Sequence, residues 1–149
     1  MILSIHTPEH FMREALKEAQ KAFDNGEVPI GAVVVSNNKI IARAHNQTEQ
    51  LNDVTAHAEM IAITSAANYL GGKYLHDCDL YVTIEPCIMC AGALQWGQLR
   101  KVVFGASDPK QGFKRIQTNL LHPKTVLEYG VLKEDCEALI KLFFQNLRE

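Results

Sequence analysis

One histidine and two cysteines constrain this chain more than any other feature of its sequence. His57 is followed two residues later by Glu59, and further along comes the run Pro86-Cys87-Ile88-Met89-Cys90. An imidazole and two thiolates are a ligand set that zinc prefers, and three protein ligands leave the fourth tetrahedral position open for water. An open position distinguishes a catalytic zinc site from a closed structural one. The pattern therefore predicts one catalytic Zn²⁺ per chain, held by His57, Cys87 and Cys90.

The sequence around the cysteines predicts a helix that presents both thiols on one face. Pro86 suits the first turn of a helix because its missing N–H costs nothing there, and an apolar run follows over residues 88–94. Cys87 and Cys90 are three residues apart, which makes them neighbours on a helix surface. The dipole at a helix N-terminus favours the thiolate, which is the form that binds metal.

Glu59 is predicted to move protons beside the metal. Residues two apart on a helix do not share a face, so we do not expect His57 and Glu59 to be ligands of one tetrahedron. A carboxylate next to a metal-bound water can act as its general base and acid. The alternative is a solvated glutamate in the first turn of a helix, where the helix dipole favours it.

Other interpretations of the cysteines remain open. A C-x-x-C pair in a cytosolic protein can be a thioredoxin-like redox pair. A structural zinc site would recruit a fourth ligand, for which Cys78, His76 and His45 are candidates. A non-enzymatic zinc-binding module would have no use for Glu59 or for an open metal position. Taken alone, Cys78 and Cys136 fit ordinary buried thiols.

The order of the predicted elements indicates an α/β fold. Apolar periodicity, capping residues and turn residues predict helices over 8–25, 56–69, 87–96 and 133–147, and strands over 32–35, 39–44, 79–84, 101–104 and 125–129. The strand over 32–35 is apolar on both faces and should be central in its sheet. Such an order describes a sheet with helices on its faces. At 149 residues, we expect a single domain over 1–149.

Charge and cysteine content set limits on partners and compartment. The formal net charge is −2, so bulk charge gives no sign of nucleic-acid binding. No stretch resembles a signal peptide or a transmembrane run, which predicts no membrane contact. Four cysteines, two of them predicted as metal ligands, favour a reducing, cytoplasmic setting.

Longer stretches of the chain resemble a known family. The combination of H-x-E with P-C-x-x-C is the known signature of zinc-dependent nucleobase deaminases. The chain resembles the cytidine deaminase superfamily and, within it, the bacterial tRNA-specific adenosine deaminases. The stretches that carry this resemblance are residues 27–33, 45–46, 55–59, 80–93 and 102–108. The resemblance implies a three-layer α/β/α sandwich with a mixed five-stranded sheet of the cytidine deaminase type, and a homodimer.

The resemblance also implies a reaction and a substrate. The reaction would be hydrolytic deamination, in which zinc lowers the pKa of its bound water toward ~7 and Glu59 carries the proton to the ring and to the departing ammonia. The substrate would be the wobble adenosine in a tRNA anticodon loop, converted to inosine. The residues implied to bind it are Val28, Pro29, Asn46, Ala58, Glu85 and Asp108. From the sequence alone, Asn46 also fits a turn residue that ends a strand.

The chain departs from the family pattern after residue 112. The tRNA enzymes typically continue with Gly-Ser shortly after this glycine, whereas this chain reads Phe113-Lys114-Arg115-Ile116. A deaminase of a free nucleobase or nucleoside is therefore the alternative function.

The same segment contains the basic residues that an RNA-binding surface would need. No acidic residue lies between Asp108 and Glu128, and the segment contains four basic residues, Lys110, Lys114, Arg115 and Lys124. Positive charge is what RNA phosphates require, and the ring of Phe113 could stack on an extruded base. We therefore predict RNA contacts at Lys110, Phe113, Lys114 and Arg115. The alternative is a solvated loop with Phe113 facing the core.

Overall fold

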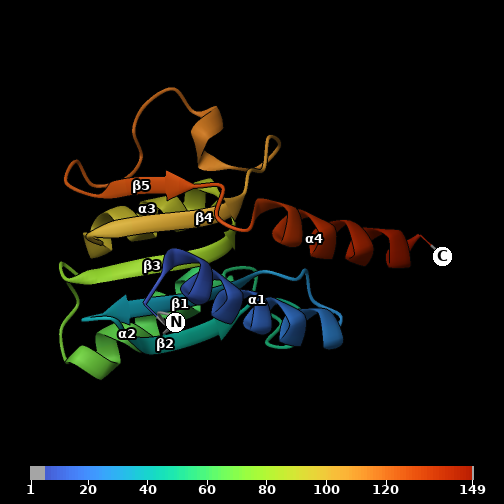
Figure 1. The fold of residues 1–149 in the computed structure, drawn as a ribbon, viewed down its shortest axis with the longest axis horizontal. Helices are drawn as coiled ribbons and strands as arrows, with labels where there is room; N and C mark the ends of the chain where they lie inside the picture. Colours follow the sequence, from blue (N-terminus) through green and yellow to red (C-terminus); the bar gives the residue numbers. More distant parts are fainter. Residues whose placement is uncertain (1–5, 149) are drawn as a thin grey trace, which may run out of the picture.

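The computed structural model describes residues 6–148 as a five-stranded sheet with helices on both faces (Figure 1). The helices are α1 (Pro8–Asp24), α2 (Ala58–Leu70), α3 (Ile88–Gly97) and α4 (Lys133–Leu147). The strands are β1 (Gly31–Ser36), β2 (Lys39–His45), β3 (Cys78–Ile84), β4 (Lys101–Ala106) and β5 (Val126–Tyr129). A short 3₁₀ helix, η1 (Phe113–Arg115), lies between β4 and β5. Each predicted helix and strand is present, with ends shifted by no more than a few residues.

The strands are ordered β2-β1-β3-β4-β5, and the sheet is mixed. β1 pairs antiparallel with β2 and with β3, whereas β3 pairs parallel with β4, and β4 with β5. Val33 and Val34 of β1 are fully buried, as are Leu80 and Val82 of β3. Strands buried on both faces show continuous apolar runs, and the predicted central position of residues 32–35 is confirmed.

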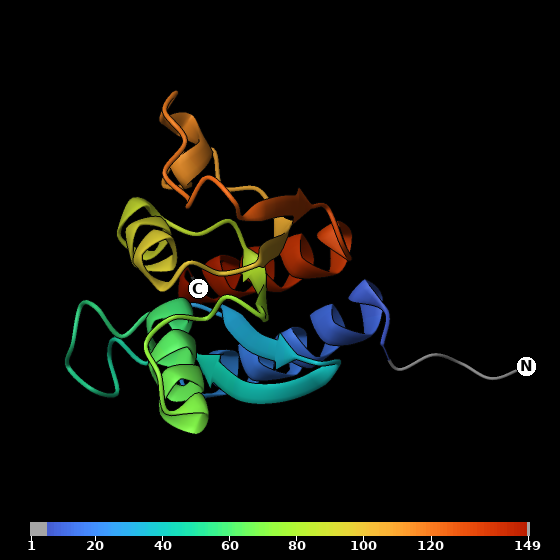
Figure 2. The same cartoon turned by 90° about the vertical axis from the view of Figure 1, so that its left-hand side faces the viewer.

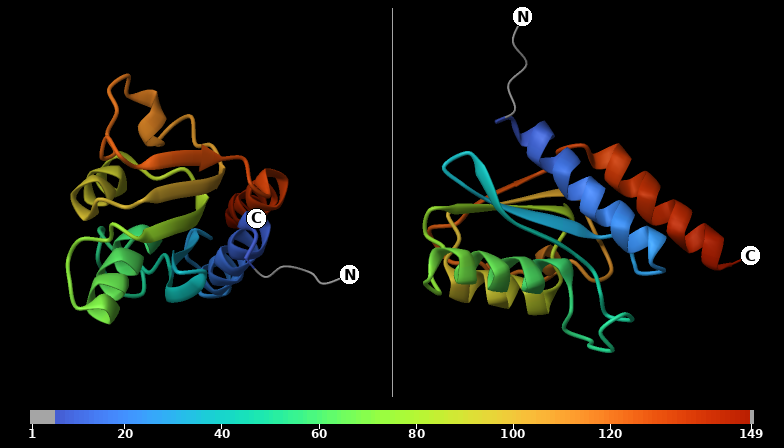
Figure 3. Two further views of the ribbon diagram at one scale, coloured as in Figure 1. Left: turned by 60° about the vertical axis from the view of Figure 1, so that its left-hand side comes forward. Right: turned by 90° about the horizontal axis from the view of Figure 1, so that it is seen from below.

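The sheet separates two layers of helices. α1 and α4 cover one face, and α2 and α3 cover the other, as the edge-on view in Figure 3 shows. This arrangement confirms the predicted three-layer α/β/α sandwich. α1 lies directly on β1 because Gly31 has no side chain, and a Cβ at this position would clash with the backbone of Ala15 and Ala19.

The ends of the parallel strands bring the predicted site residues together. β3 leads into the metal-binding segment before α3, and β4 ends at the same edge of the sheet because the two strands are parallel. The segment from 107 to 125 then runs beyond β5, at the top of Figure 2, while the loop between β2 and α2 projects beside α2. Sites in α/β sheets gather at this edge. None of the helices within residues 6–148 is long and apolar enough to cross a membrane.

Candidate active site

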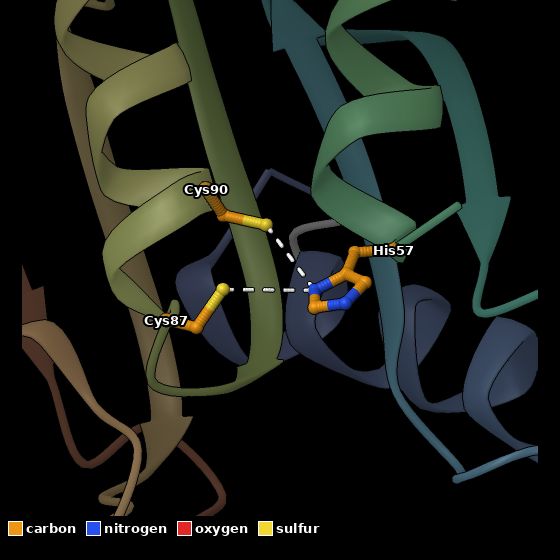
Figure 4. A group of neighbouring side chains, drawn as sticks. All are labelled: His57, Cys87 and Cys90. Carbon is orange, nitrogen blue, oxygen red and sulfur yellow. Dashed lines mark hydrogen bonds between the residues drawn. The ribbon is translucent and has the colours of Figure 1, made fainter. Parts of the chain in front are cut away.

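The three predicted metal ligands lie at the starts of two helices. His57 is the N-cap residue of α2 and Cys87 is the N-cap residue of α3, and both have extended backbone conformations. Neither side chain caps its own helix, so both are free to face each other across the gap between the helices (Figure 4). Cys90 follows in the first turn of α3, on the side that faces His57.

The spacing of the three ligand atoms fits zinc. His57 Nδ1 lies 3.6 Å from Cys87 Sγ and 3.5 Å from Cys90 Sγ. A tetrahedral zinc with ordinary Zn–N and Zn–S bonds separates the nitrogen from each sulfur by about 3.6 Å. Within residues 6–148 the group consists of these three side chains, and the candidate fourth ligands His45, His76 and Cys78 lie outside it. The group therefore has the three-ligand form of a catalytic site.

The three side chains of the group change one another's pKa values. Contact with Cys90 and with His57 lowers the pKa of Cys87 to about 4. Contact with Cys87 and burial raise the pKa of Cys90. The hydrogen bond to Cys87 also raises the pKa of His57. A divalent metal requires both thiols and the imidazole in their deprotonated forms, so its binding would release protons.

Glu59 is buried beside this group without a complete set of partners. The residue is only 3% exposed, and its buried Oε1 has no hydrogen-bond partner among residues 6–148. Burial, the largest of the effects on this group, raises the pKa of Glu59 to about 7. The interpretation of Glu59 as a solvated surface residue is therefore wrong. A carboxyl group that titrates near neutral pH is suited to accept and return a proton.

Asn46 links the end of β2 to the start of α2. It is buried, and its Oδ1 accepts a hydrogen bond of 2.9 Å from the N–H of Ala58. Because Oδ1 is engaged, a hydrogen bond from Asn46 to a base would come from its Nδ2 group. Ala58 is fully buried and its N–H is already used. A contact between Ala58 and substrate stays a prediction, and it would require this hydrogen bond to be exchanged.

The other predicted substrate residues differ in position. Val28 and Asp108 line one groove of about 600 Å³, whose opposite wall is formed by α4. Pro29 is buried behind it. The Glu85 carboxylate accepts hydrogen bonds from the backbone of the segment after β4. The Glu85 side chain therefore holds this segment in place, a role that the sequence did not predict.

The predicted RNA contacts divide into two groups. Lys110, Lys114 and Arg115 are exposed in the segment that follows β4. The prediction that Phe113 stacks on a base is wrong, because Phe113 is 4% exposed and packs edge-on against Phe104 in the core. An apolar ring is more stable when buried than on the surface of a loop. The alternative prediction, in which Phe113 faces the core, is the one that the structure bears out.

The structure separates Lys124 from the other basic residues of this segment. Lys124 lines a different pocket with His76 and Arg100, near the start of β4. An exposed aromatic residue near the basic loop is Tyr129, whose ring lies under the Lys114 ammonium at 3.7 Å. The sequence did not predict this contact of Tyr129, because nothing at the end of a weakly predicted strand indicates which side chains will lie beside it.

Comparison with known proteins decides the family. The zinc-binding region of cytidine and deoxycytidylate deaminases matches residues 5–106. The chain belongs to this deaminase family. The tRNA-specific adenosine deaminase of Bacillus subtilis (strain 168) is 50% identical over 147 residues, covering 95% of this chain and 91% of that protein. The chain is therefore a zinc-dependent deaminase that closely resembles the tRNA-specific members of its family.

Solved structures of deaminases give the same result for the fold. A structure from work on A-to-I editing by tRNA:A34 deaminases at the wobble position superimposes with a TM-score of 0.82 and 41% identity, covering 87% of this chain and 98% of that chain. A guanine deaminase from Bacillus subtilis is 40% identical, with a TM-score of 0.64, over 66% of this chain and 64% of that chain. The similarity to the tRNA deaminase structure therefore covers a larger share of each of the two compared chains than the similarity to the guanine deaminase does.

Proposed function

We propose that this deaminase converts the wobble adenosine of a tRNA to inosine and releases ammonia. The observation that carries the chemistry is the three-ligand group of His57, Cys87 and Cys90 with the partly unpaired carboxylate of Glu59 buried beside it. The choice of a tRNA substrate is supported by the similarity to tRNA-specific adenosine deaminases over nearly the full chain.

Glu59 would carry the proton through the reaction. Zinc held by the three ligands would supply a water whose pKa is lowered to about 7. Glu59 accepts a proton from the water that attacks C6 of adenine and delivers it to the adjacent ring nitrogen. Glu59 then takes the proton of the new C6 hydroxyl and passes it to the amine, so that the C6–N bond breaks, ammonia departs and the C6 oxygen becomes the carbonyl of inosine. A pKa of about 7 lets one carboxyl group serve as base and then as acid.

Substrate contacts would come from both sides of the metal group. The Nδ2 group of Asn46 would donate to the base, because its Oδ1 already accepts a hydrogen bond at the start of α2. Val28 and Asp108 line the groove that adjoins α4, where flanking nucleotides would lie. Lys110, Lys114 and Arg115 are exposed to contact phosphates.

The experiment that tests this function offers possible substrates in parallel to the zinc-loaded protein. Unmodified tRNA with adenosine at the wobble position, adenosine, adenine, cytosine and guanine are each supplied, and ammonia release is measured. We expect release with tRNA, together with inosine at the wobble position of the product. Release with guanine and none with tRNA would assign the chain to the alternative, a free-base deaminase.

We also propose that the protein is a homodimer. α3 carries apolar residues on its buried side and on its exposed side, and such a helix is normally covered on more than one side. Its outer side faces solvent, with Trp96 78% exposed and Ile88 40% exposed, and Val54 in the loop before α2 is 85% exposed. A second copy would remove this surface from water.

Sedimentation of the parent and of a Trp96→Glu variant tests the dimer. We expect the parent to sediment as a dimer and the variant to dissociate at micromolar concentration, because a charge in an apolar interface loses its hydration. A parent that sediments as a monomer would contradict the proposal. We further propose one domain over residues 1–149 and a cytoplasmic location, where tRNA and reduced cysteines are found.

A further inference from the structure

We infer that Glu85 is a positioning residue, which fixes the tRNA-binding loop of residues 108–115 to the segment that holds the metal ligand Cys87. The inference rests on the proposed function for the role of the loop, while the contacts that define the anchor are independent of it. Glu85 lies between β3 and the cysteines, so a single short segment carries both the anchor and a ligand.

Both oxygens of the Glu85 carboxylate are bound by the loop. Oε1 accepts a hydrogen bond of 3.0 Å from the N–H of Asp108, and Oε2 accepts one of 2.8 Å from the N–H of Lys114. Glu85 is 5% exposed, whereas Asp108 is half-buried and Lys114 is exposed. A carboxylate that accepts two backbone hydrogen bonds holds the two donors at fixed separation, because bonds to a charged group are the stronger kind.

The rest of the contact is built around this carboxylate. Gly112 lies against Glu85 so closely that a Cβ at residue 112 would clash with the carboxyl group. Gly112 also pairs with Cys87 in an isolated antiparallel β-bridge, and the N–H of Phe113 donates to the carbonyl of Pro86 at 2.9 Å. The loop is therefore bonded to residues 85–87 on both sides of Gly112.

The anchored loop presents groups that the proposed function needs. Asp108 has its N–H bound to Glu85, and its own Oδ1 accepts hydrogen bonds from the N–H groups of Lys110 and Gln111. Lys114 is held by its N–H, while its ammonium lies over the ring of Tyr129. A binding loop that is ordered before the ligand arrives does not lose that conformational entropy on binding. Glu85 would thereby increase affinity for tRNA without touching it.

The test compares Glu85→Gln with Asp79→Asn in the zinc-loaded full chain. Gln has nearly the same shape as Glu, but its amide donor opposes one of the loop N–H groups. Asp79 is a matched control because it is similarly buried at the other end of β3, where it binds Arg100. Amide hydrogen exchange measures the anchor directly. We expect exchange at Asp108 and Lys114 to speed up about tenfold or more in Glu85→Gln only.

Kinetics with tRNA then connect the anchor to binding. In Glu85→Gln we expect KM to rise about tenfold, with kcat and zinc content close to those of the parent. A double-mutant cycle with Lys114→Ala should be non-additive in KM, because Glu85 acts partly through Lys114. The cycle between Asp79→Asn and Lys114→Ala should be additive.

Each contrary result has its own meaning. Unchanged exchange at Asp108 and Lys114 would overturn the anchor itself. Loss of zinc would assign Glu85 to the metal centre and overturn its role in the loop. Faster exchange without a change in KM for tRNA would leave the anchor intact but contradict its role in binding. If the protein deaminates guanine and not tRNA, the exchange result still stands, and the failure belongs to the proposed substrate.

A second variant covers the case in which Glu85→Gln does not fold. Glu85→Asp keeps the buried charge but is one methylene too short to reach both amides. We expect exchange to speed up at Asp108 or Lys114, and KM for tRNA to rise less than in Glu85→Gln. Protection equal to that of the parent at both amides would count against the anchor.

Discussion

Glu59 in the metal-binding centre and Glu85 under the loop of residues 108–115 are buried to a similar extent, 3% and 5% exposed. Their carboxylates differ in their partners. Both oxygens of Glu85 accept backbone hydrogen bonds, whereas Oε1 of Glu59 has no hydrogen-bond partner in the part of the chain that the structure describes. An unpaired buried carboxylate oxygen is costly to stability, and proteins retain such groups where chemistry requires them.

In the proposed function, Glu59 is the group that reacts and Glu85 is a group that positions. A carboxylate whose two oxygens both accept backbone hydrogen bonds holds its donors in place, and these bonds to the charged form oppose its protonation. Glu27 belongs to the positioning kind, because its buried carboxylate accepts hydrogen bonds from Thr48, Glu49 and Gln50 in the loop before α2. Hydrogen bonding, rather than burial or residue type, distinguishes the roles of the three glutamates.

The largest effect is expected from removing a metal ligand. Cys90→Ala should abolish both zinc binding and activity, and it should lower the melting temperature because metal binding is coupled to folding. Elemental analysis and thermal unfolding measure these changes. Cys136→Ala is the control, since Cys136 is a buried cysteine outside the metal group. Full zinc content in Cys90→Ala would show that the reactive centre has been misassigned.

The next largest effect tests Glu59 as the reactive glutamate. Glu59→Gln should retain zinc but lower kcat by roughly 10²–10⁴-fold, because the amide cannot accept and return a proton. Zinc content and kcat are measured on the same preparation. If the variant loses its zinc, Glu59 is a metal ligand, and its assignment as the proton-carrying glutamate, in contrast to the positioning residue Glu85, is wrong.

Gly112→Ala tests the contact between Glu85 and the loop of residues 108–115 by a change in the loop itself. The backbone of Gly112 has φ −66° and ψ 148°, which alanine adopts without strain, so the expected effect comes from the clash of the new Cβ with the Glu85 carboxyl group and with the backbone carbonyl of Asp108. Such overpacking costs about 1–3 kcal/mol. We expect a lower free energy of unfolding and a higher KM for tRNA, with kcat little changed. Gly72→Ala, where a Cβ meets open space, should change neither quantity.

The smallest effect is expected from the exposed charges of the loop. Lys114→Glu with Arg115→Glu should weaken tRNA binding and flatten its dependence on salt, because fewer counterions are released. Binding at several salt concentrations measures this slope, and zinc content should not change. Lys124→Glu is the control, since Lys124 lines a separate pocket near the start of β4. Equal effects at both places would mean that the loop is not a specific RNA surface.

Short-range patterns in the sequence predicted most of the fold and the reactive centre. The apolar periodicity gave each helix and strand, because one buried face per element is a local property of the chain. The three side chains that could hold a metal were predictable because zinc requires particular side chains, and Cys87 and Cys90 share a helix face by their spacing alone. His57 could be joined to them by the chemistry of the ligand set.

The roles of Glu85, Gly112, Phe113 and Lys124 were decided only by the tertiary structure. Local sequence identifies Phe113 as an aromatic residue between basic ones, but its burial depends on Phe104 from a neighbouring strand. Likewise, Lys124 is near Lys114 in sequence, yet the return of the chain to the start of β4 places it beside His76 and Arg100.

Glu59 and Glu85 show the same division most clearly. The sequence determined that a carboxylate follows the histidine ligand and that another precedes the cysteines. Which of them is free to react depends on donors brought from elsewhere, since Asp108 and Lys114 satisfy Glu85 while Oε1 of Glu59 remains without a partner. Those donors come from a segment more than twenty residues further along, and packing of β4 beside β3 sets their position. Buried hydrogen bonds depend on distances between such remote segments, which the sequence specifies only through the completed fold.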